Sequence, residues 1–483
     1  MPEFSASHGV YRTSSDVIEV SGTWKQLLEL QGWMKGRGPL TKPTDAHLRT
    51  YFTYIHEHMH RVDLMTTPFG LLLWRIDVTI TTDARALVSH FGHPPAGTPL
   101  IEHCRRARSR IPVGPEEVHI QVWANRTVDE LERLIRFRAH VWSRAPRGFV
   151  LGELVAEGNE VLDILRARFD LPTRWRFTTS SPNAPATVSV PYRRWFGTVD
   201  VLERSATIWE RVALAAFENS WPPADQWWLD WRNAPSRYQD LGDLTDWNNL
   251  MAHRRLALDA LSGPCDPALD LSADVPIEVA LPATRWGTNQ AAVADPLRRL
   301  DPLAPPVPGA ADAVGVYEML AGATLNGRYG LFGNAERAGD GAQATDPRRS
   351  YLAFVLRRFQ DEFAQRIRIE AGLGSERQVP QLNSLVSLFD DVCVVRRTEV
   401  IGIDIGSDES GQLLLSLFIE HIHQAIAKYQ VRGEALDIVW MWRRLRPMAD
   451  RLVTDFKEAL AKVSSVTNAD QLFGVAVALY GKY

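Results

Sequence analysis

The stretch that decides the fold reads DAHLRTYFTYIHEHMHRVD over residues 45–63. Its apolar side chains recur at alternating spacings of four and three residues, at Leu48, Phe52, Ile55, Met59 and Val62. This spacing is typical of one face of an amphipathic helix. Thr44 and Asp45 offer side-chain oxygens that can cap the first free backbone N–H groups. The sequence therefore predicts a helix over 45–63.

Within this helix, His56-Glu57-His58-Met59-His60 satisfies the pattern H-E-x-x-H. At about 3.6 residues per turn, His56 and His60 lie within roughly 40° of each other, so both imidazoles can reach one metal ion. Glu57 points about 100° to the side, where its carboxylate can contact a metal-bound water. From the frequencies of histidine and glutamate in the chain, only about 0.02 chance matches are expected. We therefore interpret the pattern as a metal site; His58 projects to the opposite side and is not assigned as a ligand.

The pattern resembles the zincin metallopeptidases, in which an H-E-x-x-H helix supplies two zinc ligands and a general base. It is also similar to uncharacterised bacterial proteins in which such a helix is followed by a threonine-rich turn, as in TTPFG at 66–70 here, and later by a helix that contains a glutamate. The resemblance covers only the residues around this helix. It implies that His56 and His60 bind Zn²⁺ and that Glu57 is the general base.

A catalytic zinc site usually takes three protein ligands and a water, so a third ligand is needed. The metzincin extension is absent, because Thr66 stands where its third histidine would fall. In the gluzincin branch a glutamate on a later helix completes the set, often within E-x-x-A. Glu203-Arg204-Ser205-Ala206 fits that pattern, so the resemblance implies Glu203 as the third metal ligand. Three other carboxylates stay open as alternatives: Glu153, Glu318 and Asp200.

Further polar residues can support this chemistry. Asp63 lies on nearly the same helical face as the two histidines and could fix the tautomer of a ring. Glu210, seven positions beyond Glu203, is expected to form a salt bridge or a contact outside the ligand shell. Tyr238 and His253 are candidates by residue type alone for stabilising an oxyanion.

The remaining patterns predict an α+β fold that is predominantly helical. Helices are predicted at 127–142 with Thr127 as cap, and at 153–168, 197–221, 246–261, 314–325, 349–371, 411–429 and 448–463. Strands are predicted at 117–124, 174–179 and 186–192, with a break at 66–70 and a surface loop at 334–349. Residues 71–82 fit a buried strand or the start of another helix, and the β-branched residues at 78–81 favour the strand.

These elements suggest three parts of the chain. Residues 1–262 would form a zincin-like catalytic lobe that carries the H-E-x-x-H helix and an inserted α/β segment at about 71–195. Residues 263–313 are rich in proline and read as a connection. Residues 314–483 would form a mainly α-helical C-terminal lobe.

Composition narrows the function classes. With 54 Lys and Arg against 58 Asp and Glu, the formal net charge of −4 gives no strong electrostatic footprint for nucleic acid or an anionic membrane. Three widely spaced cysteines, Cys104, Cys265 and Cys393, argue against a disulfide framework or a cysteine zinc finger. The first residues lack the pattern of a signal peptide, and the apolar runs are shorter than the ~20 residues that span a bilayer. We expect a cytoplasmic protein.

We interpret the chain as a zinc-dependent metallohydrolase, with a peptidase as the leading reading. A peptide or protein would be the substrate, and a regulatory protein partner is expected because an ungated cytoplasmic protease would be hazardous. Two alternatives stay open. Two histidines and a carboxylate can also hold Fe²⁺, as in a peptide-modifying oxygenase that uses 2-oxoglutarate. The chain could instead be a non-enzymatic helical interaction protein whose histidines serve packing.

Overall fold

The computed structural model describes the following parts of the chain: residues 9–12, 17–20, 22, 24–34, 43–65, 68–108, 117–142, 148–169, 176–190, 194–218, 257, 260–261, 275–282, 284, 394–396, 400–401, 410–455, 457–458 and 465–480. These residues are mostly helical with few strands, which confirms a predominantly helical class. None of their helices is both long and apolar enough to cross a membrane.

The helices of the described residues are α1 (Trp24–Met34), α2 (Asp45–Met65), α3 (Pro68–Phe91), α4 (Leu100–Arg108), α5 (Glu117–Trp142), α6 (Leu151–Phe169), α7 (Thr198–Glu218), α10 (Ile277–Ala280), α16 (Ser410–Arg432), α17 (Ile438–Asp455) and α19 (Ala469–Leu479). The strands are β1 (Gly9–Arg12), β2 (Val17–Val20), β3 (Phe177–Thr178), β4 (Val188–Val190), β5 (Arg194–Phe196), β6 (Val275–Pro276), β7 (Val394–Arg396) and β8 (Val400–Ile401).

The largest sheet of the described residues has the strand order β1-β2-β7-β8 and pairs strands near the N-terminus with strands within 394–401. Strands β1 and β2 are antiparallel, β2 pairs in parallel with β7, and β7 is antiparallel to β8. Two small sheets pair β3 with β6 and β4 with β5. The strands predicted at 174–179 and 186–192 are thus confirmed in part, as the shorter β3 and β4.

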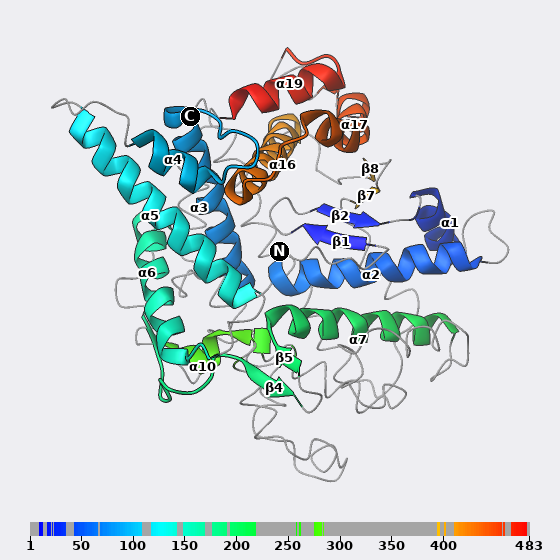
Figure 1. The fold of residues 1–483 in the computed structure, drawn as a ribbon. Helices are drawn as coiled ribbons and strands as arrows, with labels where there is room; N and C mark the ends of the chain where they lie inside the picture. Colours follow the sequence, from blue (N-terminus) through cyan, green and yellow to red (C-terminus); the bar gives the residue numbers. More distant parts are fainter. Residues whose placement is uncertain are drawn as a thin grey trace, which may run out of the picture.

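Helix α2 lies between this sheet and α7, as Figure 1 shows. The predicted helix at 45–63 is confirmed and extends to Met65. Its apolar stripe is buried from Phe52 to Val62, but so are polar side chains on other faces, including His58, Arg61 and Asp63. The helix is enclosed on several sides because β1, β2, α1, α3 and α7 all pack against it.

Helix α3 corrects the strand predicted at 71–82. Pro68 is its first residue, a position where the missing N–H of proline costs no helical hydrogen bond. Its β-branched threonines fit the helix because their hydroxyls donate to carbonyls four residues earlier: Thr79 to Arg75, Thr81 to Asp77 and Thr82 to Val78. Helix α3 packs against both α5 and α16.

The break predicted at 66–70 is also wrong over Pro68–Gly70, which belong to the first turn of α3. Gly70 is needed there for steric reasons, since an added Cβ would overlap the backbone carbonyl of Leu64 at the end of α2. This close approach lets α2 and α3 follow each other with only residues 66 and 67 between them.

The strand predicted at 117–124 is wrong as well, because α5 begins at Glu117. Val118, Ile120 and Val122 alternate in sequence but are exposed, so their spacing reflects no half-buried strand. Thr127 does not cap a helix; its hydroxyl donates to the carbonyl of Trp123 inside α5. The buried side chains of α5 begin at Ala124 and continue to Val141.

Other predicted helices agree with the structure. The predictions at 153–168, 197–221 and 411–429 correspond to α6, α7 and α16. The helix predicted at 448–463 begins earlier, at Ile438, and α19 was not predicted. Of 246–261 the structure describes residues 257, 260 and 261, all helical. The predicted helices at 314–325 and 349–371 and the loop at 334–349 lie outside the described residues. Of the connection predicted at 263–313 the structure describes 275–282 and 284, which include β6 and α10.

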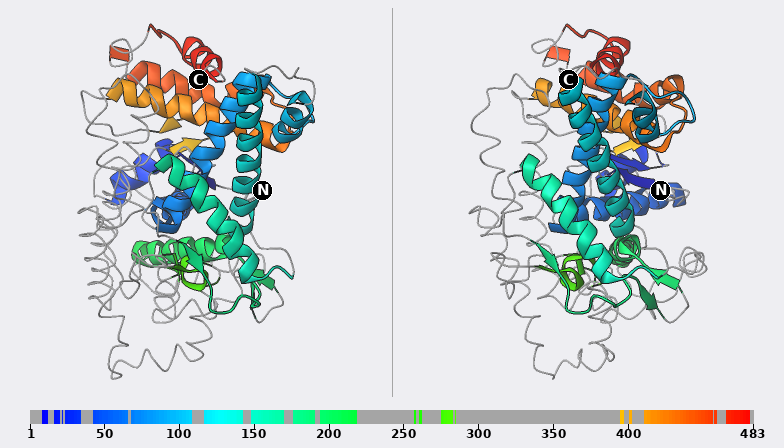
Figure 2. Two further views of the ribbon diagram at one scale, coloured as in Figure 1. Left: turned by 90° about the vertical axis from the view of Figure 1, so that its left-hand side faces the viewer. Right: turned by 60° about the vertical axis from the view of Figure 1, so that its left-hand side comes forward.

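Two hydrophobic cores meet on α3. One contains Leu72 and Leu73 of α3 with side chains of α5, α6 and α10. The other contains Ala84 and Leu87 of α3 with side chains of α4, α5, α16, α17 and α19. In both views of Figure 2 the C-terminal helices lie at the end of the molecule opposite α7. The predicted lobe boundaries stay a prediction, but the C-terminal helices share a core with α3.

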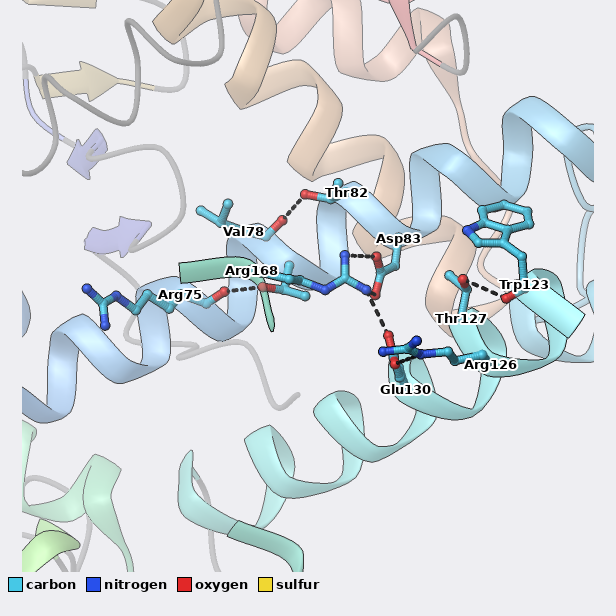
Figure 3. A network of polar contacts seen from close by, with 10 residues as sticks. Arg75, Val78, Thr82, Asp83, Trp123, Arg126, Thr127, Glu130 and Arg168 are labelled. Carbon is cyan, nitrogen blue, oxygen red and sulfur yellow. Dashed lines mark hydrogen bonds and ion pairs between the residues drawn. The ribbon is translucent and has the colours of Figure 1, made fainter. Parts of the chain in front are cut away.

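A polar network also joins three of these helices (Figure 3). Arg168 of α6 places its guanidinium 2.7 Å from Asp83 of α3 and 2.8 Å from Glu130 of α5. Arg126, one turn earlier in α5, contacts the same Glu130 at 2.6 Å. The network fixes α3, α5 and α6 relative to one another.

Candidate metal centre

The candidate metal centre lies where α2 packs against α7. His56 and His60 stand one turn apart on α2, and Glu203 stands on the facing side of α7. The four-residue spacing places both imidazoles on one helical face, as predicted from the sequence. The structure thus brings together the three residues that the resemblance implied as metal ligands.

The donor atoms of these residues converge. His56 Nε2 lies 3.2 Å from His60 Nε2. Glu203 Oε2 lies 3.5 Å from His56 Nε2, and the other carboxylate oxygen, Oε1, lies 3.6 Å from His60 Nε2. Among the residues that the structure describes, this trio is the group of His, Cys, Asp and Glu side chains that could share an ion.

This donor set fits a divalent transition metal. Zinc binds histidine nitrogen and carboxylate oxygen at about 2.0–2.2 Å, so two ligands at a tetrahedral angle lie about 3.3 Å apart. The two histidine nitrogens are 3.2 Å apart, which is close to this value. Each lies 3.5–3.6 Å from a different oxygen of Glu203, and with one ligand atom from each residue all three atoms lie within 4.8 Å of one another. Two histidines and one carboxylate also suit Fe²⁺, so the donors do not distinguish the two ions.

Burial strengthens the electrostatics of the centre. The exposed fractions of His60 and Glu203 are 8% and 3%, and His56 is only slightly more exposed. Burial opposes the charged form of His56, but contacts with Glu203 and Glu210 outweigh it and raise the pKa of His56 well above its ordinary value. For Glu203, burial favours the neutral form, but the two histidines hold the pKa of the carboxyl well below its ordinary value. A divalent cation would therefore displace a proton held by the centre.

Glu57 lies on the flank of α2 that faces β1. Its exposed fraction is 5%, and the backbone of β1 approaches it closely at Gly9. A Cβ added to Gly9 would lie 2.8 Å from both Cγ and Oε1 of Glu57. The predicted general base is thus positioned by the sheet, while the predicted ligands face α7. Sequence reasoning missed Gly9, because no local pattern links the strand to the helix.

Two carboxylates next to the centre tie α2 to α7. Asp63 accepts a short hydrogen bond from Ser205, and both side chains are fully buried. Glu210 also lies against His56, with its Oε2 3.3 Å from His56 Nδ1. The hydrogen bond between Asp63 and Ser205 joins the two helices beside Glu203, and the role of Asp63 in orienting a ring stays a prediction.

The alternative ligands that the structure describes lie elsewhere. Glu153 is in the first turn of α6 and accepts a hydrogen bond from the backbone N–H of Val150. Asp200 accepts from the backbone N–H of Gly197 and so caps the start of α7. Neither belongs to the trio around His56 and His60. Glu318, Tyr238 and His253 lie outside the described residues.

The chain matches no family model, no curated protein and no solved structure. The geometry of the site is therefore the basis on which a function can be assigned.

Proposed function

We propose that this protein is a zinc-dependent metallohydrolase that acts on peptides, with His56, His60 and Glu203 as the metal ligands. The observation that carries the proposal is the convergence of their donor atoms at 3.2–3.6 Å on two packed helices. A buried carboxylate beside two imidazoles is costly unless a cation or proton compensates its charge. A resident metal ion accounts for this arrangement.

In this proposal the chain supplies the acid–base chemistry through Glu57. Bound zinc would polarise a carbonyl and lower the pKa of a water molecule. The Glu57 carboxylate accepts a proton from the attacking water and passes it to the nitrogen of the leaving amine. Its packing against Gly9 limits the positions that this carboxylate can adopt, which favours proton transfer along one path.

The peptide substrate class is supported by the sheet beside Glu57. Among the described strands, β1 is an edge strand of its sheet: it pairs with β2 along one edge, and no described strand pairs with its other edge. An outer strand offers backbone N–H and C=O groups to which an extended peptide can add. We propose that α2, α7 and this sheet form the zincin-like catalytic lobe, with a scissile peptide held between β1 and the metal centre.

The first experiment measures the metal content of the purified full chain by inductively coupled plasma mass spectrometry. Wild type should carry about one zinc per chain, while His56→Ala and Glu203→Ala should carry little. Glu153→Ala is the matched control, because it removes the same side chain from another E-x-x-A segment on α6. Iron in place of zinc would favour the oxygenase alternative. Absence of metal from wild type would contradict the proposal and favour an interaction protein.

The second experiment tests Glu57 as the proton carrier. Glu57→Gln keeps the shape of the side chain but removes its basic carboxylate. We expect it to retain zinc and to lose cleavage of a peptide library by about 10²–10⁴-fold. Equal cleavage by wild type and the variant would exclude the assigned role of Glu57.

A further inference from the structure

Glu210 is placed to act on His56 from the side opposite the proposed metal ion. Its carboxylate Oε2 is 3.3 Å from His56 Nδ1, whereas His56 Nε2 faces His60 and Glu203. Both partners are largely enclosed, with side-chain exposed fractions of 14% for His56 and 11% for Glu210. One imidazole is therefore held between two carboxylates, one at each ring nitrogen.

The direction of α7 explains this placement. Glu203 and Glu210 are seven residues apart, about two turns, so they share one face of the helix. Glu203 contacts both histidines, and Glu210 reaches the earlier one, His56, because α7 runs antiparallel to α2 (Figure 1). The buried Ser205–Asp63 hydrogen bond holds the same two helices in register.

A neutral imidazole can bind a metal through Nε2 only when its proton is on Nδ1. A carboxylate that accepts a hydrogen bond from Nδ1–H fixes this tautomer, orients the ring and makes Nε2 a better donor. We infer that Glu210 is a positioning residue that holds His56 in this tautomer for metal binding; the inference rests on the metal centre proposed above. One helix thus supplies both a metal ligand and the group that orients another ligand.

The test compares the zinc affinity of full-length Glu210→Ala and Glu210→Gln with that of wild type, by competition with a chromophoric chelator. Loss of an orienting partner typically weakens metal binding by about 10–100-fold, and we expect this for Glu210→Ala. Glu210→Gln should be affected less, because its amide oxygen can still accept from Nδ1–H.

A matched control separates positioning from general stability. His140 Nδ1 lies 2.7 Å from Glu157 Oε2 between α5 and α6, which is the same kind of contact away from the trio. Glu157→Ala should leave zinc affinity unchanged even where it lowers the melting temperature. The absorption spectrum of the Co²⁺-loaded protein should change in Glu210→Ala and be restored towards wild type in Glu210→Gln.

Each outcome bears on the inference. Wild-type zinc affinity in Glu210→Ala would overturn it and leave the metal centre standing. Complete loss of the metal from Glu210→Ala, with retention in Glu203→Ala, would overturn it by making Glu210 the ligand. Absence of zinc from wild type would overturn the proposed metal centre, and with it the orienting role.

Discussion

At the scale of single residues, Gly9 lets the backbone of β1 lie directly against the predicted general base. Three elements therefore determine the geometry around α2: β1 positions Glu57, α7 supplies Glu203, and α2 itself sets the spacing of the histidines. A change at Gly9 should affect catalysis without touching any ligand.

We expect Gly9→Ala to reduce peptide cleavage by about 10-fold or more while zinc content stays near one per chain. The new methyl group would lie 2.6 Å from Thr53 Cγ2 and 2.8 Å from Glu57 Oε1, so the carboxylate must move. Steady-state cleavage rates and metal analysis on the same preparation check this. The control is Gly474→Ala on α19, where an added Cβ meets nothing within 4 Å. Unchanged cleavage in Gly9→Ala would show that the contact does not position Glu57.

At the scale of elements, one carboxylate ties α10 to the loop that follows β3. Glu278 accepts hydrogen bonds from the backbone N–H groups of Ser180 and Ser181 and from the hydroxyl of Thr179. Burial alone favours the neutral carboxyl, but these hydrogen bonds outweigh it and lower the pKa of Glu278 below its ordinary value. The ionised side chain therefore stabilises the folded state.

This linkage predicts a pH-dependent stability difference between wild type and Glu278→Gln. Because the folded pKa is below the unfolded value, the stabilisation is present above the unfolded pKa and is lost as the pH falls through the folded pKa. The variant should melt below wild type at neutral pH, and the difference should shrink in acid. Thermal melts over a pH series measure it, with the exposed Glu458→Gln as control. A difference that stays constant or grows in acid would contradict the assignment.

At the scale of the whole molecule, α3 is the helix on which the two cores meet. Arg168 adds a polar link, because it contacts α3 through Asp83 and α5 through Glu130 (Figure 3). The exposed fraction of the Asp83 side chain is 3%, against 30% for Arg168. A buried carboxylate that loses its cation is strongly destabilising.

We expect Arg168→Met to lower the free energy of unfolding by about 2–3 kcal/mol, somewhat less than for a fully buried pair. Arg106→Met is the control, since Arg106 pairs with Glu102 at an exposed site on α4 and should cost at most about 0.5 kcal/mol. Urea unfolding gives both values. Adding Asp83→Asn to Arg168→Met should recover part of the lost unfolding free energy. If the losses of the two single variants simply add in the double variant, the ion pair between Arg168 and Asp83 does not carry the effect.

The sequence by itself determined the elements whose pattern is local. The four-three stripe over 45–63 predicted α2, and the spacing of His56 and His60 placed two imidazoles on one face. Prediction from the sequence was wrong where the tertiary environment of a segment overrides the local secondary-structure preference of its residues. The β-branched threonines of α3 favoured a strand prediction, but in the structure their hydroxyls donate to carbonyls within the helix. The alternating apolar side chains at the start of α5 also favoured a strand, but they are exposed.

The packing of α7 against α2 determines which carboxylates meet the histidines. A resemblance singled out Glu203, but Glu153 and Glu318 fit the same E-x-x-A pattern, and Asp200 offers another carboxylate on the same helix. The packing of α7 on α2 brings Glu203 to His56 and His60. Glu210 reaches His56 across 154 positions of the chain. Helical periodicity fixes the spacing of side chains within one element, whereas the contact between two elements depends on how their buried faces pack.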